Sequence, residues 1–107
     1  MAIRGCKTRA TERFLAGERV KEFQTFATAA AKALTRLQAA VRLSDLRNPP
    51  SNHFEALGGK RRGEYSIRIN DRWQVCFVWV PMGEIAEGTD ALNVLGEPDE
   101  VEIVDYH

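Results

Sequence analysis

The apolar residues between positions 23 and 41 recur in steps of three and four. This is the period of a helix that buries one face, and the stretch 25–40 is rich in Ala and Leu, which lose little conformational entropy in a helix. A shorter helix is predicted over 9–16, ending at Gly17, a residue typical of helix C-termini. The pattern therefore predicts two antiparallel helices joined near residues 17–21. The apolar positions of the longer helix are Phe23, Phe26, Ala27, Ala30, Leu34, Leu37 and Val41.

After Pro49 and Pro50, through which a helix cannot continue, the apolar period changes to two. This alternation predicts a strand over 65–70 and a second strand over 73–79, with Asn70-Asp71 as the turn of a hairpin, since both residues tolerate left-handed conformations. One face of the hairpin is apolar, and the other carries Arg68 and Gln74. The apolar face is formed by Ile67, Ile69, Trp73, Val75, Phe77 and Trp79.

Residues 81–99 contain three Gly and five acidic side chains, and we expect a long exposed connection there. Residues 100–106 alternate again and predict a third strand. Helices followed by an antiparallel sheet indicate the α+β class. The helices are expected to cover the apolar face of the sheet and to leave the other face open.

The composition is that of one ordinary globular domain, expected to span residues 1–107. No apolar run approaches the roughly 20 residues that span a bilayer, and the N-terminal stretch lacks the apolar core of a secretory signal. We therefore expect a cytoplasmic protein whose Cys6 and Cys76 are reduced thiols. Two Cys and two His make a structural zinc site improbable, and no metal or other cofactor is expected.

The formal net charge of zero hides a strong asymmetry. Residues 1–79 hold all fifteen Lys and Arg and seven acidic residues, whereas residues 80–107 hold eight acidic residues and no basic one. Clustered cations are the footprint of a phosphate binder. The alternative is that the two parts of the chain neutralise each other in the fold.

The stretch NPPSNHFEALGGKRRGEYSIRINDRWQVCFVW, residues 48–79, and the ending VEIVDYH, residues 101–107, resemble the HigB/GraT-like toxins of the RelE/ParE toxin superfamily. The resemblance runs from about Leu46 to Trp79 and again over 100–107. It implies a RelE/ParE-like fold, in which two N-terminal helices pack on one face of a small twisted antiparallel sheet. A short first strand near Ile3 is also implied.

The resemblance implies the toxin of a type II toxin–antitoxin system. Such toxins are ribosome-dependent endoribonucleases (mRNA interferases) that enter the A site, contact 16S rRNA and cleave mRNA through attack by the ribose 2′-OH, without a metal. The implied partner is a HigA-like helix-turn-helix antitoxin, through which alone the toxin would contact DNA. No membrane partner is implied.

Metal-free RNA cleavage needs a base, an acid and cations around the phosphate. The resemblance places these groups in the loop before the hairpin, in the hairpin and at the last three positions. The implied catalytic residues are Lys60, Arg68, Asp105, Tyr106 and His107. The implied RNA- or phosphate-binding residues are His53, Arg61, Arg62, Arg72 and Gln74.

Each of these assignments has a structural alternative. Lys60, Arg61 and Arg62 also fit a solvated charge run, and Arg68 also fits a salt bridge to Asp71 or to a C-terminal acid. His53 also fits an ordinary surface histidine, and the last three residues also fit a solvated tail.

Two positions depart from the family pattern. Many relatives have Arg where this chain has Gln74, and many HigB proteins have Lys where it has Gly58. Gln offers neutral donors and does not stabilise a phosphorane as a cation does. An attenuated or non-catalytic toxin that acts through antitoxin binding and operon regulation is therefore one alternative. A ParE-type inhibitor of DNA gyrase is the other.

Overall fold

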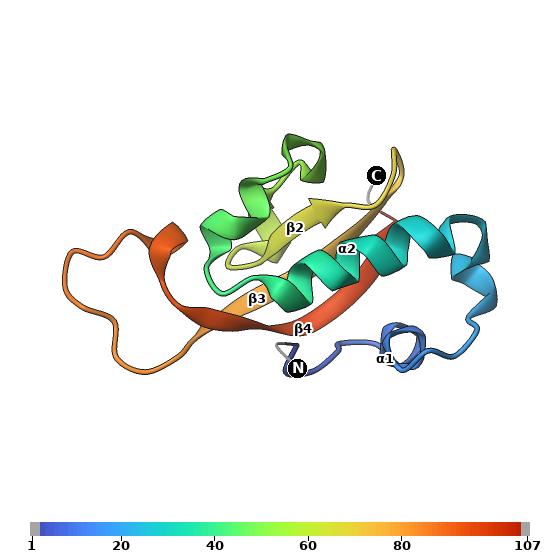
Figure 1. Ribbon diagram of the computed structural model, residues 1–107, viewed down its shortest axis with the longest axis horizontal. Coiled ribbons are helices and arrows are strands. Elements are labelled where there is room, and N and C mark those ends of the chain that lie inside the picture. The colour runs from blue at the N-terminus through green and yellow to red at the C-terminus, as the bar shows by residue number, and fades with distance from the viewer. Residues whose placement is uncertain (1–2, 106–107) are drawn as a thin grey trace.

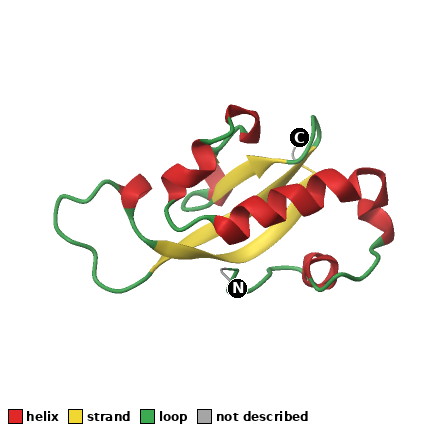
Figure 2. Ribbon diagram, viewed as in Figure 1, coloured by secondary structure: helices red, strands yellow, loops and turns green. Residues whose placement is uncertain are grey.

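The computed structural model describes residues 3–105, and within them an α+β architecture (Figures 1 and 2). Four strands form one antiparallel sheet in the order β1-β2-β3-β4. The periodicity predicted three of these strands and missed the one at Glu55–Ala56. The two α-helices precede the sheet in the chain: α1, Arg9–Leu15, and α2, Ala27–Ala39. The strands are β1, Glu55–Ala56; β2, Tyr65–Arg68; β3, Trp73–Pro81; and β4, Gly96–Asp105. Short 3₁₀ helices connect them: η1, Lys21–Phe26; η2, Leu43–Arg47; η3, Pro50–Asn52; η4, Gly59–Arg61; and η5, Ala91–Asn93.

Helix α2 lies along one face of the sheet (Figure 1). Its buried side chains, Leu34 and Leu37 among them, share a core with Ile67, Val75 and Ile103, which sit opposite one another on β2, β3 and β4. Burying such side chains is the main favourable term in folding. The ring of Phe26 stacks on Trp73 at a centroid distance of 4.8 Å, which fixes the start of α2 over the hairpin.

The predicted antiparallel helix pair is wrong. Figure 1 shows α1 end-on and α2 lengthwise, so the two helices cross steeply. The predicted helix over 23–41 also begins as the 3₁₀ helix η1 and ends at Ala39. The backbone becomes extended at Ala40, and the Asp45 carboxylate accepts hydrogen bonds from the N–H groups of Val41 and Arg42. This turn away from the helix leaves Val41 48% exposed instead of buried.

The outer edge of β4 is covered by the N-terminal segment. The N–H of Arg4 donates to the carbonyl of Pro98, and the N–H of Ile103 donates to Oγ1 of Thr11 on α1 at 3.0 Å. A sheet edge left unpaired would expose backbone groups to other chains. No strand is present near Ile3 in the described residues: besides these hydrogen bonds, the segment forms one isolated parallel bridge to β4, from Cys6 to Val101.

The hairpin turn differs in detail from the prediction. It spans the four residues between Arg68 and Trp73, and neither central residue has a positive φ. Instead, Oδ1 of Asn70 accepts hydrogen bonds from the N–H groups of Arg72 and Trp73. The Asn side chain thus replaces a backbone acceptor in the turn.

The exposed connection is shorter than predicted, because β4 begins at Gly96 and pairs with the far end of β3. A Cβ on Gly96 would lie 2.5 Å from Nε1 of Trp79 and from the carbonyl oxygen of Val80, so only glycine fits this close approach. A bulge at Glu100, with a φ of 49°, shifts the strand register between Cys76 and Val78.

Candidate functional site

The sheet face opposite α2 carries two rows of neighbouring side chains, and we call it the open face. One row runs across the sheet from Ser66 through Cys76 to Glu102, and the next from Arg68 through Gln74 to Val104. Residues directly opposite on adjacent strands share a face, and rows two residues apart are separated by roughly 7 Å. The candidate cations gather around these two rows.

Arg61 contacts Glu102, the last residue of the first row. It comes from η4, and its Nη1 lies 3.1 Å from Oε1 of Glu64 and 3.4 Å from Oε1 of Glu102. The three side chains are only 30%, 14% and 17% exposed. Arg61 therefore ties the loop before β2 to β4, and its charge is balanced by two carboxylates of the same chain.

Cys76 is a buried free thiol beneath this cluster. Burial raises the pKa of Cys76 to about 11, and the carboxylates of Glu64 and Glu102 act in the same direction. The positive charge of Arg61 opposes the shift without cancelling it. At neutral pH the thiol is therefore protonated and is no nucleophile.

His53 and Arg68 come together at the second row. His53 follows the last residue of η3 and has a φ of 46°, and its Nε2 lies 3.4 Å from Nη1 of Arg68. Nη2 of Arg68 also forms an ion pair with Asp71. Arg68 is 34% exposed, so a guanidinium edge remains within reach of a ligand phosphate. The ion pair proposed as the structural alternative for Arg68 is thus present.

Arg72 and Asp105 meet at the same end of the sheet. Nε of Arg72 donates to Oδ2 of Asp105 at 2.8 Å, which joins the hairpin turn to the last described residue of β4. The side chain of Arg72 is 65% exposed. Tyr106 and His107, which the sequence resemblance marks as catalytic, lie outside the described residues.

Gln74 is the central residue of the second row, with Arg68 opposite it on β2 and Val104 opposite it on β4. Its Oε1 is buried and has no hydrogen-bond partner among residues 3–105. A buried acceptor without a donor costs free energy, so this position is not optimised for stability. Such sites often have a functional reason.

Lys60 and Arg62 flank Arg61 and are exposed to solvent. Neither makes an ion pair or a side-chain hydrogen bond with another described residue, unlike Arg61. The charge asymmetry of the sequence is therefore partly cancelled in the fold: Asp99, Glu102 and Asp105 pair with Arg4, Arg61 and Arg72 respectively.

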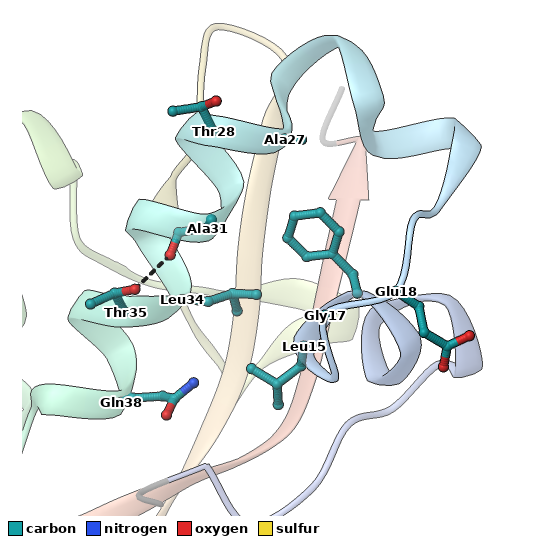
Figure 3. A pocket seen from close by; sticks show the side chains of 10 residues that line it. Leu15, Gly17, Glu18, Ala27, Thr28, Ala31, Leu34, Thr35 and Gln38 are labelled. Atoms are coloured by element: carbon teal, nitrogen blue, oxygen red, sulfur yellow. Dashed lines mark hydrogen bonds between the residues drawn. The ribbon is translucent and has the colours of Figure 1, made fainter.

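A groove of about 430 Å³ lies on the helical side, between α1 and α2 (Figure 3). Phe14, Leu15 and Leu34 line it together with small and polar residues, and its only charged side chain is Glu18. Without a cation, this groove does not suit a phosphate ligand. No group of three or more His, Cys, Asp or Glu side chains in residues 3–105 could hold a metal ion. None of the described helices has both the length and the hydropathy to cross a bilayer.

Comparison with known proteins identifies the family of the chain. A family model described as the RelE-like toxin of the type II toxin–antitoxin system HigB matches residues 8–90. The chain belongs to the HigB-like toxin family. The match includes every candidate residue from His53 to Gln74 and ends before Asp105. The family resemblance of the sequence is thereby confirmed.

Two curated proteins are similar to part of the chain. Toxin HigB-1 of Vibrio cholerae is 47% identical over 49 residues, which are 46% of this chain and 52% of that protein. An uncharacterized protein of Haemophilus influenzae is 40% identical over 47 residues, 44% of this chain and 46% of its own length. The chain spans about half the length of the curated relatives it matches.

Sequence reasoning missed the carboxylates that hold the site together. The sequence did not single out Glu64 or Glu102, although Oε1 of Glu102 lies 3.4 Å from Nη1 of Arg61. The parity of β4 carried a signal, because Glu102 and Val104 alternate with the buried Val101 and Ile103. The sequence of the loop around Arg61 contains no comparable pattern that would predict its contact with Glu102.

Proposed function

We propose that this HigB-like chain is the toxin of a type II toxin–antitoxin system and acts as a ribosome-dependent endoribonuclease. The observation that carries the proposal is that two contacts, His53 with Arg68 and Arg72 with Asp105, lie at the hairpin end of the sheet. These residues come from the end of η3, the hairpin and β4, and supply an imidazole, two guanidinium groups and a carboxylate. Attack of a ribose 2′-OH on the adjacent phosphate, with departure of the 5′ oxygen, uses such groups to move protons and to stabilise the developing charge.

In this proposal the message lies across the open face in the ribosomal A site. Arg68 and Lys60 stabilise the charge that develops on the phosphate, and Asp105, Tyr106 and His107 orient and transfer protons. His53, Arg61, Arg62, Arg72 and Gln74 bind the RNA. The cations of the site are partly or largely exposed, so the site positions RNA poorly by itself and needs 16S rRNA to fix the message.

The partner that such a toxin requires is a HigA-like helix-turn-helix antitoxin, and DNA is contacted only through that partner. We therefore expect a small helix-turn-helix protein, encoded beside this chain's gene, to co-purify with it on co-expression. High-yield expression of the chain alone without growth arrest would contradict the active-toxin proposal.

The central experiment adds the purified chain to translating ribosomes that carry a labelled message. We expect cleavage in the A site, no cleavage of the same RNA without ribosomes, and no inhibition of gyrase supercoiling. His107→Ala is expected to lower the single-turnover rate by about 10²–10⁴-fold. Cleavage of free RNA at the same rate, or equal rates for wild type and His107→Ala, would overturn this assignment.

An attenuated toxin is the second candidate. It is favoured by Gln74, a neutral residue at a position where a cation is expected, and by the pairing of Arg61, Arg68 and Arg72 with carboxylates. A message phosphate must compete with these carboxylates for each guanidinium. Under this alternative the chain binds its antitoxin and regulates the operon but cleaves slowly.

A further inference from the structure

Exposed apolar side chains collect where β3 passes into β4. The N–H of Met82 donates to the carbonyl of Leu95 at 2.9 Å, and the N–H of Gly96 donates to the carbonyl of Val41 at 3.1 Å. Met82, Ile85 and Leu95 also line one hollow of about 140 Å³. Every large apolar side chain that is exposed in residues 3–105 belongs to this group, which we call the apolar end patch: Val41, Met82, Ile85 and Leu95.

The apolar end patch has an acidic rim. Glu84, Glu87 and Asp90 are exposed in the same connection, which contains no Lys or Arg. Arg42 forms an isolated bridge with Leu95, and its N–H donates to the carboxylate of Asp45. The net negative rim repels phosphate, so RNA does not suit this surface. It suits a protein segment that flanks apolar side chains with Lys or Arg.

The apolar end patch is far from the candidate site. Strand β3 runs from Trp73, beside the cations, to Pro81, beside Met82, and nine strand residues span roughly 26 Å. Figure 1 shows the 82–95 connection projecting from one end of the long axis, with the β2–β3 turn toward the other end. The 82–95 connection therefore does not cover the open face, and a partner could bind at this end while the cations stay accessible.

We propose that the apolar end patch binds a basic amphipathic segment of the antitoxin. The inference rests on the proposed function, which supplies that partner. A second copy of this chain fits less well, because its Arg61, Arg68 and Arg72 are already paired with carboxylates. Lys60 and Arg62, which make no ion pair with another described residue, stand in the stretch GGKRRG, which offers no apolar side chain beside them. The hollow lined by Met82, Ile85 and Leu95 also suits an amphipathic helix, which inserts apolar anchors spaced by three or four residues.

The test titrates the helix-turn-helix protein encoded beside this chain's gene into purified chain variants by calorimetry. Two variants change the apolar end patch: Met82→Ser/Ile85→Ser removes apolar contact, and Glu84→Lys/Glu87→Lys reverses the rim charge. The matched control, Glu18→Lys/Glu22→Lys, makes the same charge change on exposed residues before α2. Circular dichroism checks the fold of each variant.

Both patch variants are expected to raise the Kd at least about tenfold, and the control is expected to stay within about twofold of wild type. The effect of the charge reversal should shrink as the salt concentration rises, because screening weakens exposed charges. If Met82→Ser/Ile85→Ser does not fold, the Kd of Glu84→Lys/Glu87→Lys tests the inference, since that variant changes only exposed side chains.

Several outcomes would overturn the inference. Wild-type affinity in both patch variants would show that the antitoxin binds elsewhere and would leave the proposed function standing. No binding by the wild-type chain would overturn the inference and the proposed function together. Unchanged antitoxin binding, combined with loss of self-association in sedimentation or of ribosome binding in pelleting, would assign the patch to a second copy or to the ribosome.

Discussion

Arg61 and Glu102 join two segments that are 41 positions apart, with Nη1 of the arginine 3.4 Å from Oε1 of the glutamate. This contact holds the guanidinium of Arg61 close to the buried Cys76. The same Nη1 of Arg61 also donates to Oε1 of Glu64 at 3.1 Å. Of the three consecutive cations at 60–62, the central one is thus held by the fold, and its neighbours remain exposed to solvent.

Replacing Glu102 with Gln is expected to strengthen RNA binding. Removal of one carboxylate from Arg61 leaves its charge less balanced, and a unit charge about 6 Å from a phosphate in water is worth roughly 0.7 kcal/mol, or about threefold in Kd. Fluorescence anisotropy with a short single-stranded RNA at low salt measures the change. Glu97→Gln, five residues earlier on β4, is the control. Equal affinity in the two variants would show that Arg61 does not face the RNA.

The Gln74→Arg variant tests whether a missing cation limits the chemistry. A side chain here lies opposite Arg68 on the open face, and a single added transition-state donor is worth up to about 10²–10³-fold in other enzymes. We expect the single-turnover rate of A-site cleavage to rise at least about tenfold. Gln74→Lys separates charge from guanidinium geometry. An unchanged rate in both variants would mean that Gln74 is no weak point of the site.

The Gln74→Met variant tests the cost of the buried amide oxygen. Met keeps the length and approximate shape of the side chain but removes the acceptor that has no partner among the described residues. Removing an unsatisfied buried polar group is expected to stabilise the protein by about 1 kcal/mol. Urea denaturation measures this difference. A loss of stability would show that the amide is bound by a group outside residues 3–105.

Thr11 is expected to be more important for stability than an average threonine. It is fully buried, and its Oγ1 accepts from the N–H of Ile103, so Thr11→Val leaves a backbone donor of β4 unpaired. The expected loss is about 1–3 kcal/mol. Thr35→Val is the control, because Thr35 is exposed and bonds only to Ala31 in its own helix. A comparable loss in both variants would exclude a special role for the β4 edge contact.

The raised pKa of Cys76 predicts a loss of stability in alkaline solution. The folded-state pKa is about 11, against 9.0 for the unperturbed thiol. Between these values the unfolded chain loses the proton and the folded chain keeps it, so stability falls as pH rises from 9 to 11. The change amounts to at most about 3 kcal/mol.

This pH effect is measured by urea denaturation at several pH values in a Cys6→Ala background, because burial also raises the pKa of Cys6. The additional Cys76→Ala change should remove the steeper part of the decline. Parallel pH profiles with and without Cys76 would show that the thiol does not carry the effect.

The periodicity of the sequence was sufficient for the α+β class, for the buried side of α2 and for the hairpin. Each depends on the spacing of apolar residues along one element, as with Leu34 and Leu37 or with Val75 and Phe77. The periodicity wrongly predicted that Val41 is buried on the helix, which ends before this residue. The hydrogen bond from the N–H of Val41 to the carboxylate of Asp45 cannot be predicted from the spacing of apolar residues. The periodicity also missed the first residues of β4, whose pairing depends on the close approach of Trp79 to Gly96.

The candidate site shows the same division. Residue types and their order along the chain identified the cations and the family, because phosphate binding needs particular functional groups. The distances between those groups follow from strand register and from one loop conformation, since Arg61 and Glu102, like Arg72 and Asp105, are brought together only by the assembled sheet. The sequence alone therefore determined which chemical groups the chain carries and which face of each element is apolar. The tertiary structure decided which cations are neutralised and where the exposed apolar residues collect, because both depend on contacts between residues far apart in the chain.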